Sequence, residues 1–152
     1  MTPLTSATVA MVKEVIGRPD YSITLTLKPA YRSRRDTTKQ SDAYQALSWF
    51  LHVLNNRCFG HGCRRRGNEL GVFSVLEGIG PYEQPHWHIA VRLPKALSHE
   101  RFMSAFDKAR RKTRRFGDQY DIQPFYQRGW FEYCLKHGVE SFCPEFLRAG
   151  TP

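Results

Sequence analysis

Hydrophobic and polar residues alternate over residues 21–28, which read Tyr-Ser-Ile-Thr-Leu-Thr-Leu-Lys. Side chains alternate between the two faces of a strand, so this segment predicts a strand with its apolar residues facing inward and Thr24 and Thr26 facing outward. Further apolar segments predict three more strands, at residues 70–77, 85–93 and 120–126. Turn residues at 78–81 indicate that the second and third strands pair as an antiparallel hairpin, and Pro124 indicates that the last strand lies at a sheet edge.

Three other segments place apolar residues three or four positions apart, which is the spacing of an amphipathic helix. The first runs from a cap at Ser41 or Asp42 to about residue 56, and the second runs from a cap at Ser98 to about residue 114. The third covers residues 127–137, and Gly138 is placed to terminate it.

The predicted order of elements is therefore strand, helix, strand, strand, helix, strand, helix. This is the split βαβ arrangement of ferredoxin-like and RRM-like domains. We expect an α+β fold, with an antiparallel sheet of four or five strands, helices on one face and the other face open. Residues 21–143 would form this single domain, after a weakly ordered lead-in or short helix at residues 1–20 and before a short tail at residues 144–152.

The charge of the chain points to a polyanionic partner. Its 152 residues include 23 Lys and Arg against 14 Asp and Glu, a formal net charge of +9. Nucleic acid is the commonest partner of such a protein. No apolar stretch is long enough to cross a bilayer, and the N-terminus lacks a signal-peptide pattern, so we expect no membrane partner and a location in the cytoplasm of a bacterial host.

Two histidines in the predicted strand 85–93 are candidates for metal binding. His86 and His88 flank Trp87, so both imidazoles face the side of the strand opposite to the indole. A pair of neighbouring imidazoles can bind a divalent metal ion, although the same pattern also occurs on polar strand surfaces. The sequence thus leaves both interpretations open at this point.

Glu77 is the expected third ligand, because it ends the strand that pairs with the histidine strand. Simple alternation places Glu77 with Phe73 and Val75, so we expect a bulge or twist at Gly78 to turn the carboxylate toward the histidines. Two imidazoles and one carboxylate leave coordination positions open for phosphate oxygens. This donor set favours Mg²⁺ or Mn²⁺ as the cofactor.

Tyr133 and Lys136 are candidate catalytic residues in the last predicted helix. Phe131 and Leu135 lie one turn apart and define its buried stripe, whereas Tyr133 falls on the opposite side of the helix. Lys136 follows by three residues and shares the polar side with the tyrosine. A cation beside an exposed phenol favours the phenolate and suits nucleophilic attack, although a tyrosine with a chance lysine neighbour is the simpler interpretation.

Three basic segments can follow a phosphate backbone, although each one alone is more often a solvated surface. They occupy the loop before residue 40, the loop after residue 58 and the helix at residues 98–114. Together with the outward threonines of the first strand, they give the candidate DNA-binding residues Thr24, Thr26, Arg32, Arg34, Arg35, Arg64, Arg65, Arg66, Lys108 and Arg111.

The segment from Cys58 to Cys63 contains His61 and suggests a structural zinc site. Its spacing lacks a matching second pair, although Cys134, His137 or Cys143 can in principle supply a further ligand. A flexible basic loop is the favoured interpretation of this segment.

The chain resembles the HUH endonuclease superfamily, in particular its single-tyrosine rolling-circle replication initiators. The resemblance rests on three motifs in the family's order: Ile23-Thr24-Leu25-Thr26-Leu27, His86-Trp87-His88 and Tyr133-Cys134-Leu135-Lys136. It implies a metal ion held by His86, His88 and Glu77, and attack by Tyr133 on a phosphate of single-stranded DNA. The products would be a 5′-phosphotyrosine link and a free 3′-OH, which can prime replication of a plasmid or phage or later reseal the strand.

The same resemblance implies that Lys136 orients the phosphate or shares in proton transfer. No Gly-x-x-x-x-Gly-Lys-Ser/Thr sequence occurs, so we expect no helicase domain, and a host helicase or supercoiling would supply the unwinding. A single-tyrosine transposase of the same superfamily is the alternative enzyme, and either a monomer or a homodimer fits. A non-catalytic RRM-like module that binds single strands is the alternative outside enzymes.

Overall fold

The computed structural model describes residues 1–29, 39–126 and 128–152. Arg32, Arg34 and Arg35, three of the expected DNA-binding residues, lie outside the described residues. The elements, in chain order, are the helix α1 (Pro3–Ile16), β1 (Tyr21–Leu27), α2 (Lys39–Phe59), the 3₁₀ turn η1 (Cys63–Arg66), β2 (Gly71–Glu77), β3 (His86–Arg92), α3 (His99–Lys112), β4 (Phe116–Pro124), α4 (Trp130–Cys134), and the 3₁₀ turns η2 (Val139–Ser141) and η3 (Pro144–Phe146).

The four strands form one antiparallel sheet in the order β2-β3-β1-β4. The strand β3 lies between β2 and β1, which is the split βαβ arrangement that the sequence predicts, and the α+β fold class is confirmed. β4 is an edge strand, as Pro124 indicates, but it begins at Phe116 rather than near residue 120. The sheet thus has the lower of the two predicted strand numbers.

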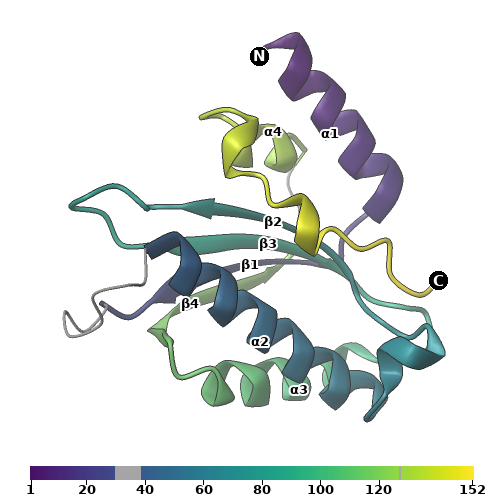
Figure 1. Ribbon diagram of the computed structural model, residues 1–152. Helices are drawn as coiled ribbons and strands as arrows, with labels where there is room; N and C mark the ends of the chain where they lie inside the picture. The colour runs from purple at the N-terminus through teal and green to yellow at the C-terminus, as the bar shows by residue number, and fades with distance from the viewer. Residues whose placement is uncertain (30–38, 127) are drawn as a thin grey trace.

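One face of the sheet packs against α2 and α3 (Figure 1). Ile23 and Leu25 of β1 and Trp87 of β3 are buried in this first core. Trp87 also donates a hydrogen bond from Nε1 to the carbonyl oxygen of Ala43 in α2, at 3.0 Å, so its one polar atom is satisfied. This packing fixes Trp87 on the helix side and therefore turns the neighbouring histidines to the other side.

The opposite face is not open along its whole width, which corrects the prediction of helices on one face only. α1 and α4 cover part of it and form a second core with β2 and β3 (Figure 1). Phe73 of β2 is fully buried there and contacts the rings of Trp130 and Phe131. Because β2 is apolar on both faces, its run of hydrophobic residues serves two cores rather than one.

Residues 3–16 form a regular helix, so of the two expectations for the lead-in the short helix is the one observed. Its side chains Val12 and Ile16 are fully buried in the second core. In the last turn of α1, Nζ of Lys13 makes a 3.1 Å ion pair with Oε1 of Glu132 in α4. α1 therefore supports the element that carries the candidate tyrosine.

α4 is shorter than the predicted helix 127–137. It begins after Gly129, whose φ of 80° lies in the left-handed region, and it ends at Cys134. A turn continues the chain, in which the amide of Lys136 donates to the carbonyl of Tyr133 at 3.2 Å and the amide of Gly138 donates to that of Leu135 at 3.0 Å. The spacing of three residues between tyrosine and lysine still places them together.

The expected short tail at residues 144–152 pairs with the edge strand β2 through backbone hydrogen bonds. The backbones of Val72 and Arg148 exchange hydrogen bonds of 2.9 and 3.0 Å, and the amide of Thr151 donates to the carbonyl of Glu69 at 2.9 Å. The edge of β2 is thereby covered. Within the described ranges, no helix is long and apolar enough to span a membrane.

We predict that Phe73→Ala lowers the free energy of unfolding by about 3–5 kcal/mol, because it opens a cavity where three aromatic rings meet. Urea denaturation followed by circular dichroism measures this loss. Leu4→Ala is the control, since Leu4 is 62% exposed and its truncation should change stability by less than about 0.5 kcal/mol. Equal effects of the two variants would contradict the second core.

Candidate metal centre and tyrosine helix

Glu77, His86 and His88 come together on the sheet face opposite to α2 and α3. The Oε2 atom of Glu77 lies 3.3 Å from Nε2 of His86 and 3.3 Å from Nε2 of His88. The two imidazole rings are 5.0 Å apart between centroids. Of all His, Cys, Asp and Glu side chains within residues 1–29, 39–126 and 128–152, only these three form a group that can hold a metal ion.

Strand register explains this convergence. His86 pairs with Glu77 on one side and Thr26 on the other, and His88 pairs with Thr24. Glu77 needs no bulge to reach the histidines, which corrects the expectation of a twist at Gly78. Alternation places Glu77 on the same side of β2 as Phe73 and Val75, and Val75 pairs with His88, so this side is the histidine face. Because β2 is buried on both faces, Phe73 and Val75 can lie on the histidine side and still belong to a core.

The residues present fit a divalent metal ion. The Oε1 atom of Glu77 is buried and has no hydrogen-bond partner among the described residues. An unpaired buried carboxylate oxygen is costly, and a cation at this position would satisfy it. Nδ1 of His86 lies 3.0 Å from the carbonyl oxygen of Gln84, so that nitrogen donates its proton there and Nε2 keeps a lone pair for a metal.

Burial also suits His88 to metal binding. Its side chain is 18% exposed, and desolvation lowers its pKa although the Glu77 carboxylate opposes the shift. Electrostatic interaction with the neighbouring His86 and Lys136 also lowers the pKa of His88. A lowered pKa keeps the imidazole neutral, which is the form that binds a metal ion. Its Nδ1 lies 3.3 Å from Oγ1 of Thr24, which orients the ring.

Tyr133 lies on the outer side of α4, as its helical position predicts. Its side chain is 56% exposed, whereas Phe131 and Leu135 are buried in the second core. The Nζ atom of Lys136 lies 3.9 Å from the centroid of the tyrosine ring. The neighbouring Tyr133 side chain, and to a lesser degree the charge of Glu77, raise the pKa of Lys136.

The other predicted DNA-binding residues are dispersed. Thr24 and Thr26 share the histidine face, as expected. Arg64, Arg65 and Arg66 form η1 after α2, and Lys108 and Arg111 belong to α3, so these five residues lie on the helix side of the sheet (Figure 1). The metal centre does not include them, and their role in DNA binding stays a prediction.

The possible zinc site is not observed. Cys58, His61 and Cys63 do not form a metal-binding group in the part of the chain that the structure describes. Cys58 and Cys63 are buried, and burial raises the pKa of the Cys58 thiol to about 12, which disfavours the thiolate that zinc requires. Arg66 instead closes this loop by donating to the carbonyls of Phe59 and His61 at 3.1 and 2.8 Å.

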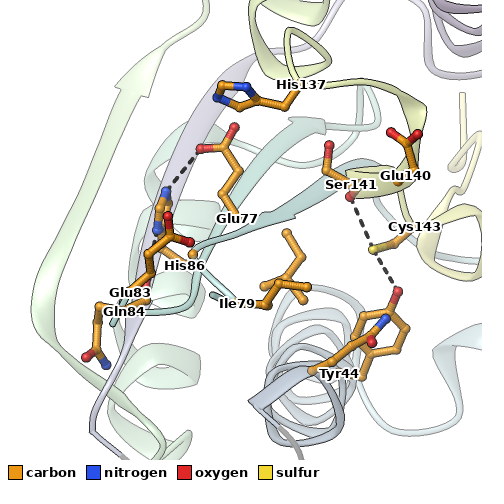
Figure 2. Close-up of a pocket in the computed structure, with 13 residues that line it drawn as sticks. Tyr44, Glu77, Ile79, Glu83, Gln84, His86, His137, Glu140, Ser141 and Cys143 are labelled. Carbon is orange, nitrogen blue, oxygen red and sulfur yellow. Dashed lines mark hydrogen bonds and ion pairs between the residues drawn. The ribbon is translucent and has the colours of Figure 1, made fainter. Parts of the chain in front are cut away.

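A pocket of about 630 Å³ beside the metal centre was not predicted (Figure 2). Glu77 and His86 form part of its wall, and Ile79, in the turn between β2 and β3, lies opposite the segment that follows α4. One signal in the sequence can indicate such a wall: Ile79 is a large apolar residue between two glycines in a turn, where it cannot join a strand face.

In comparisons with models of protein families, with curated proteins and with solved structures, none matched this chain. The site is therefore interpreted from its own chemistry.

We predict that the protein binds Mn²⁺ at one site and that Glu77→Gln and His88→Ala each weaken binding by more than about tenfold. Mutation of residues that only hydrogen-bond to metal ligands already weakens metal binding by about tenfold, so loss of a ligand should cost more. Calorimetric titration of the metal-free protein measures the affinity. Cys58→Ala should bind Mn²⁺ like the unaltered chain. Loss of binding in that control, with retention in His88→Ala, would contradict the assignment of the ligands.

A second prediction concerns the cysteines. Burial raises the pKa of the Cys58 and Cys134 thiols to about 12 and also raises that of Cys143. Because these values exceed those of the unfolded chain, the stability that they contribute is present below about pH 9 and is lost as the pH rises toward 12. A disulfide reagent at pH 8.5 should label these thiols slowly in the native protein and rapidly in denaturant. Rapid labelling of the native protein would contradict their burial.

Proposed function

We propose that this protein nicks and rejoins single-stranded DNA, using a divalent metal ion at Glu77, His86 and His88 and forming a 5′-phosphotyrosine link at Tyr133. The proposed role is initiation of rolling-circle replication of a plasmid or phage. The observation that carries the proposal is that His137, next to Lys136, lines one pocket with Glu77 and His86, while Nζ of Lys136 lies 3.9 Å from the centroid of the Tyr133 ring. These contacts support a single site in which Tyr133 is the nucleophile and Glu77, His86 and His88 hold the metal ion.

The metal ion, which we propose to be Mg²⁺ or Mn²⁺, would supply positive charge that polarises the scissile phosphate. The chain's own residues perform the remaining work. The Tyr133 oxygen forms a bond to phosphorus while the bond from phosphorus to the 3′ oxygen breaks, so the phosphate is transferred and its bond energy is kept. The phenol loses one proton and the 3′ oxygen gains one.

Lys136 is suited to this transfer because its ammonium lies 3.9 Å from the centroid of the Tyr133 ring. Its raised pKa keeps the side chain charged, so the ammonium can stabilise the oxygen of Tyr133 as the proton leaves. The same cation can donate a hydrogen bond to a phosphate oxygen, on which negative charge increases during the transfer. Positioning of phenol, cation and metal ligands supplies the catalytic advantage.

The exposed part of the sheet also favours an enzyme over an RRM-like binding module. Such modules stack bases on aromatic side chains of the open sheet face. Toward β4, where this face is not covered by the second core, the residues beside the histidines are polar: Thr24 and Thr26 in β1, with Asp121 and Gln123 of β4 paired with β1. The aromatic Trp87 lies on the helix side.

We predict that Tyr133→Phe binds single-stranded DNA with unchanged affinity and forms no covalent adduct, because only the attacking oxygen is removed. Incubation of labelled DNA with Mn²⁺, followed by denaturing gel electrophoresis and mass mapping of the adduct, measures the step. Tyr126→Phe is the matched control, since Tyr126 is another exposed tyrosine and should leave adduct yield unchanged. An adduct formed by Tyr133→Phe would show that another residue is the nucleophile.

The variant Lys136→Ala should slow adduct formation by about a hundredfold, the usual contribution of a positioned proton donor or cation. Its affinity for Mn²⁺ should stay within about threefold of the unaltered protein, because Lys136 is not a ligand. Single-turnover kinetics and metal titration separate the two effects. A parallel loss of metal affinity would mean that Lys136 acts on the metal centre and not on the tyrosine.

A further inference from the structure

The pocket beside the metal centre is placed to receive part of the DNA substrate. Its wall includes Glu77 and His86, so any occupant lies directly next to the proposed metal position (Figure 2). Its volume of about 630 Å³ is in the range of sites that bind small organic molecules. The remaining walls come from the β2–β3 turn, the start of α2 and the segment after α4.

One side of the pocket is apolar. Ile79 is 49% exposed and lines the pocket. Exposed apolar surface of this kind, next to polar residues, is typical of a ligand-binding groove. Tyr44 contributes its ring, which is held by contacts with Trp87 and Phe146 and by a 3.2 Å hydrogen bond between its hydroxyl and Sγ of Cys143. A flat apolar group can therefore pack between fixed side chains.

The polar groups of the pocket include two carboxylates besides Glu77, those of Glu83 and Glu140, which accept hydrogen bonds when ionised. Glu140 and Ser141 line the side formed by η2, and Gln40 lines the side formed by α2. Among the described residues that line the pocket there is no Lys or Arg. Away from the proposed metal position, a phosphate group would meet the carboxylates of Glu83 and Glu140 without a lysine or arginine, whereas a base that donates N–H groups would be accommodated.

The turn that carries Ile79 is held in place before any ligand binds. Nζ of Lys39 in α2 donates to the carbonyl oxygens of Gly80 and Glu83 at 2.7 and 2.8 Å. The side chain of Gln84 donates to the carbonyl of Leu27 in β1. Because both ends of the turn are tied to regular elements, binding costs little ordering of this wall.

We propose that this pocket binds one nucleobase of the single-stranded DNA, from a nucleotide adjacent to the scissile phosphate. This inference rests on the proposed function, since it places the base relative to the phosphate at the metal centre. The apolar wall contacts the face of the base, and the acceptors contact its exocyclic amino group. Adenine, cytosine or guanine is therefore preferred over thymine, which has no amino group.

The experiment uses the full chain and a pool of random single-stranded DNA, in two arms. In the first arm the unaltered protein reacts with the pool and Mn²⁺, and the DNA of the covalent adducts is sequenced outward from the nick. In the second arm Tyr133→Phe binds the same pool without metal, and the retained DNA is sequenced. We expect one position next to the nick at which thymine is depleted, and the same preference in the bound pool.

Two variants test the assignment to the pocket. Ile79→Ala removes the apolar contact at a half-exposed position, and it should reduce the preference at that position by roughly tenfold, as for a lost apolar contact in a specificity pocket. Glu140→Gln exchanges a charged acceptor for an amide that also donates, and it should increase the share of thymine. Tyr82→Ala is the matched control, because Tyr82 is fully exposed on the same turn and does not line the pocket.

Each outcome bears on one proposal. Adducts without any base preference near the nick, or a preference that Ile79→Ala and Glu140→Gln leave unchanged, would overturn the base pocket and leave the nicking activity standing. A preference lost equally in Tyr82→Ala would also overturn the pocket. No adduct in the first arm, with selected bases in the second that change in the pocket variants, would overturn the proposed function and keep a base-binding site.

Discussion

The register between β2 and β3 is the constraint on which the rest of the site depends. It pairs Glu77 with His86 and therefore places the carboxylate on the face where both imidazoles lie. A slip of one residue would turn Glu77 toward α2 and α3 and bury its charge in the first core. Burial of β2 on both faces prevents this slip, because Phe73 must remain in the second core while Val72 and Leu76 remain in the first. Packing on both sides thus fixes the geometry of the ligands.

The two halves of the candidate site come from different layers of the molecule. The metal ligands belong to the sheet, whereas Tyr133 and Lys136 belong to a short helix and the turn after it, which lie over the second core. The two halves adjoin at one pocket, which Glu77 and His86 line together with His137, the residue after Lys136. A lysine in this place can respond both to the charge at the metal position and to the protonation of the phenol. The spacing of three residues is what places the ammonium of Lys136 over the ring of Tyr133.

Much of the fold could be predicted from local patterns. Apolar and polar residues alternate in β1, and two histidines flank Trp87 in β3, because side chains of a strand point to its two faces in turn. The prediction of a free sheet face failed for a physical reason. A run such as that of β2 has no alternation to show that it is buried twice, and the apolar stripe of α1 has no partner nearby in sequence. The lack of alternation in β2 also explains the expectation that Glu77 needs a bulge to face the histidines. The pocket could not be predicted, since its walls are separated by about a hundred residues and meet only in the folded chain.

The ion pair between Lys13 and Glu132 gives the first helix a place in the chemistry that its distance along the chain conceals. α1 carries none of the candidate metal ligands, but in the second core it packs against β2 and β3 and supports the helix that carries Tyr133, the proposed nucleophile. A partner that binds to α1, or a change that loosens it, would therefore act both on the strand that carries Glu77 and on the helix that carries Tyr133. Under the proposed function, binding of the ion and attachment of the DNA would thus both depend on the packing of this first helix.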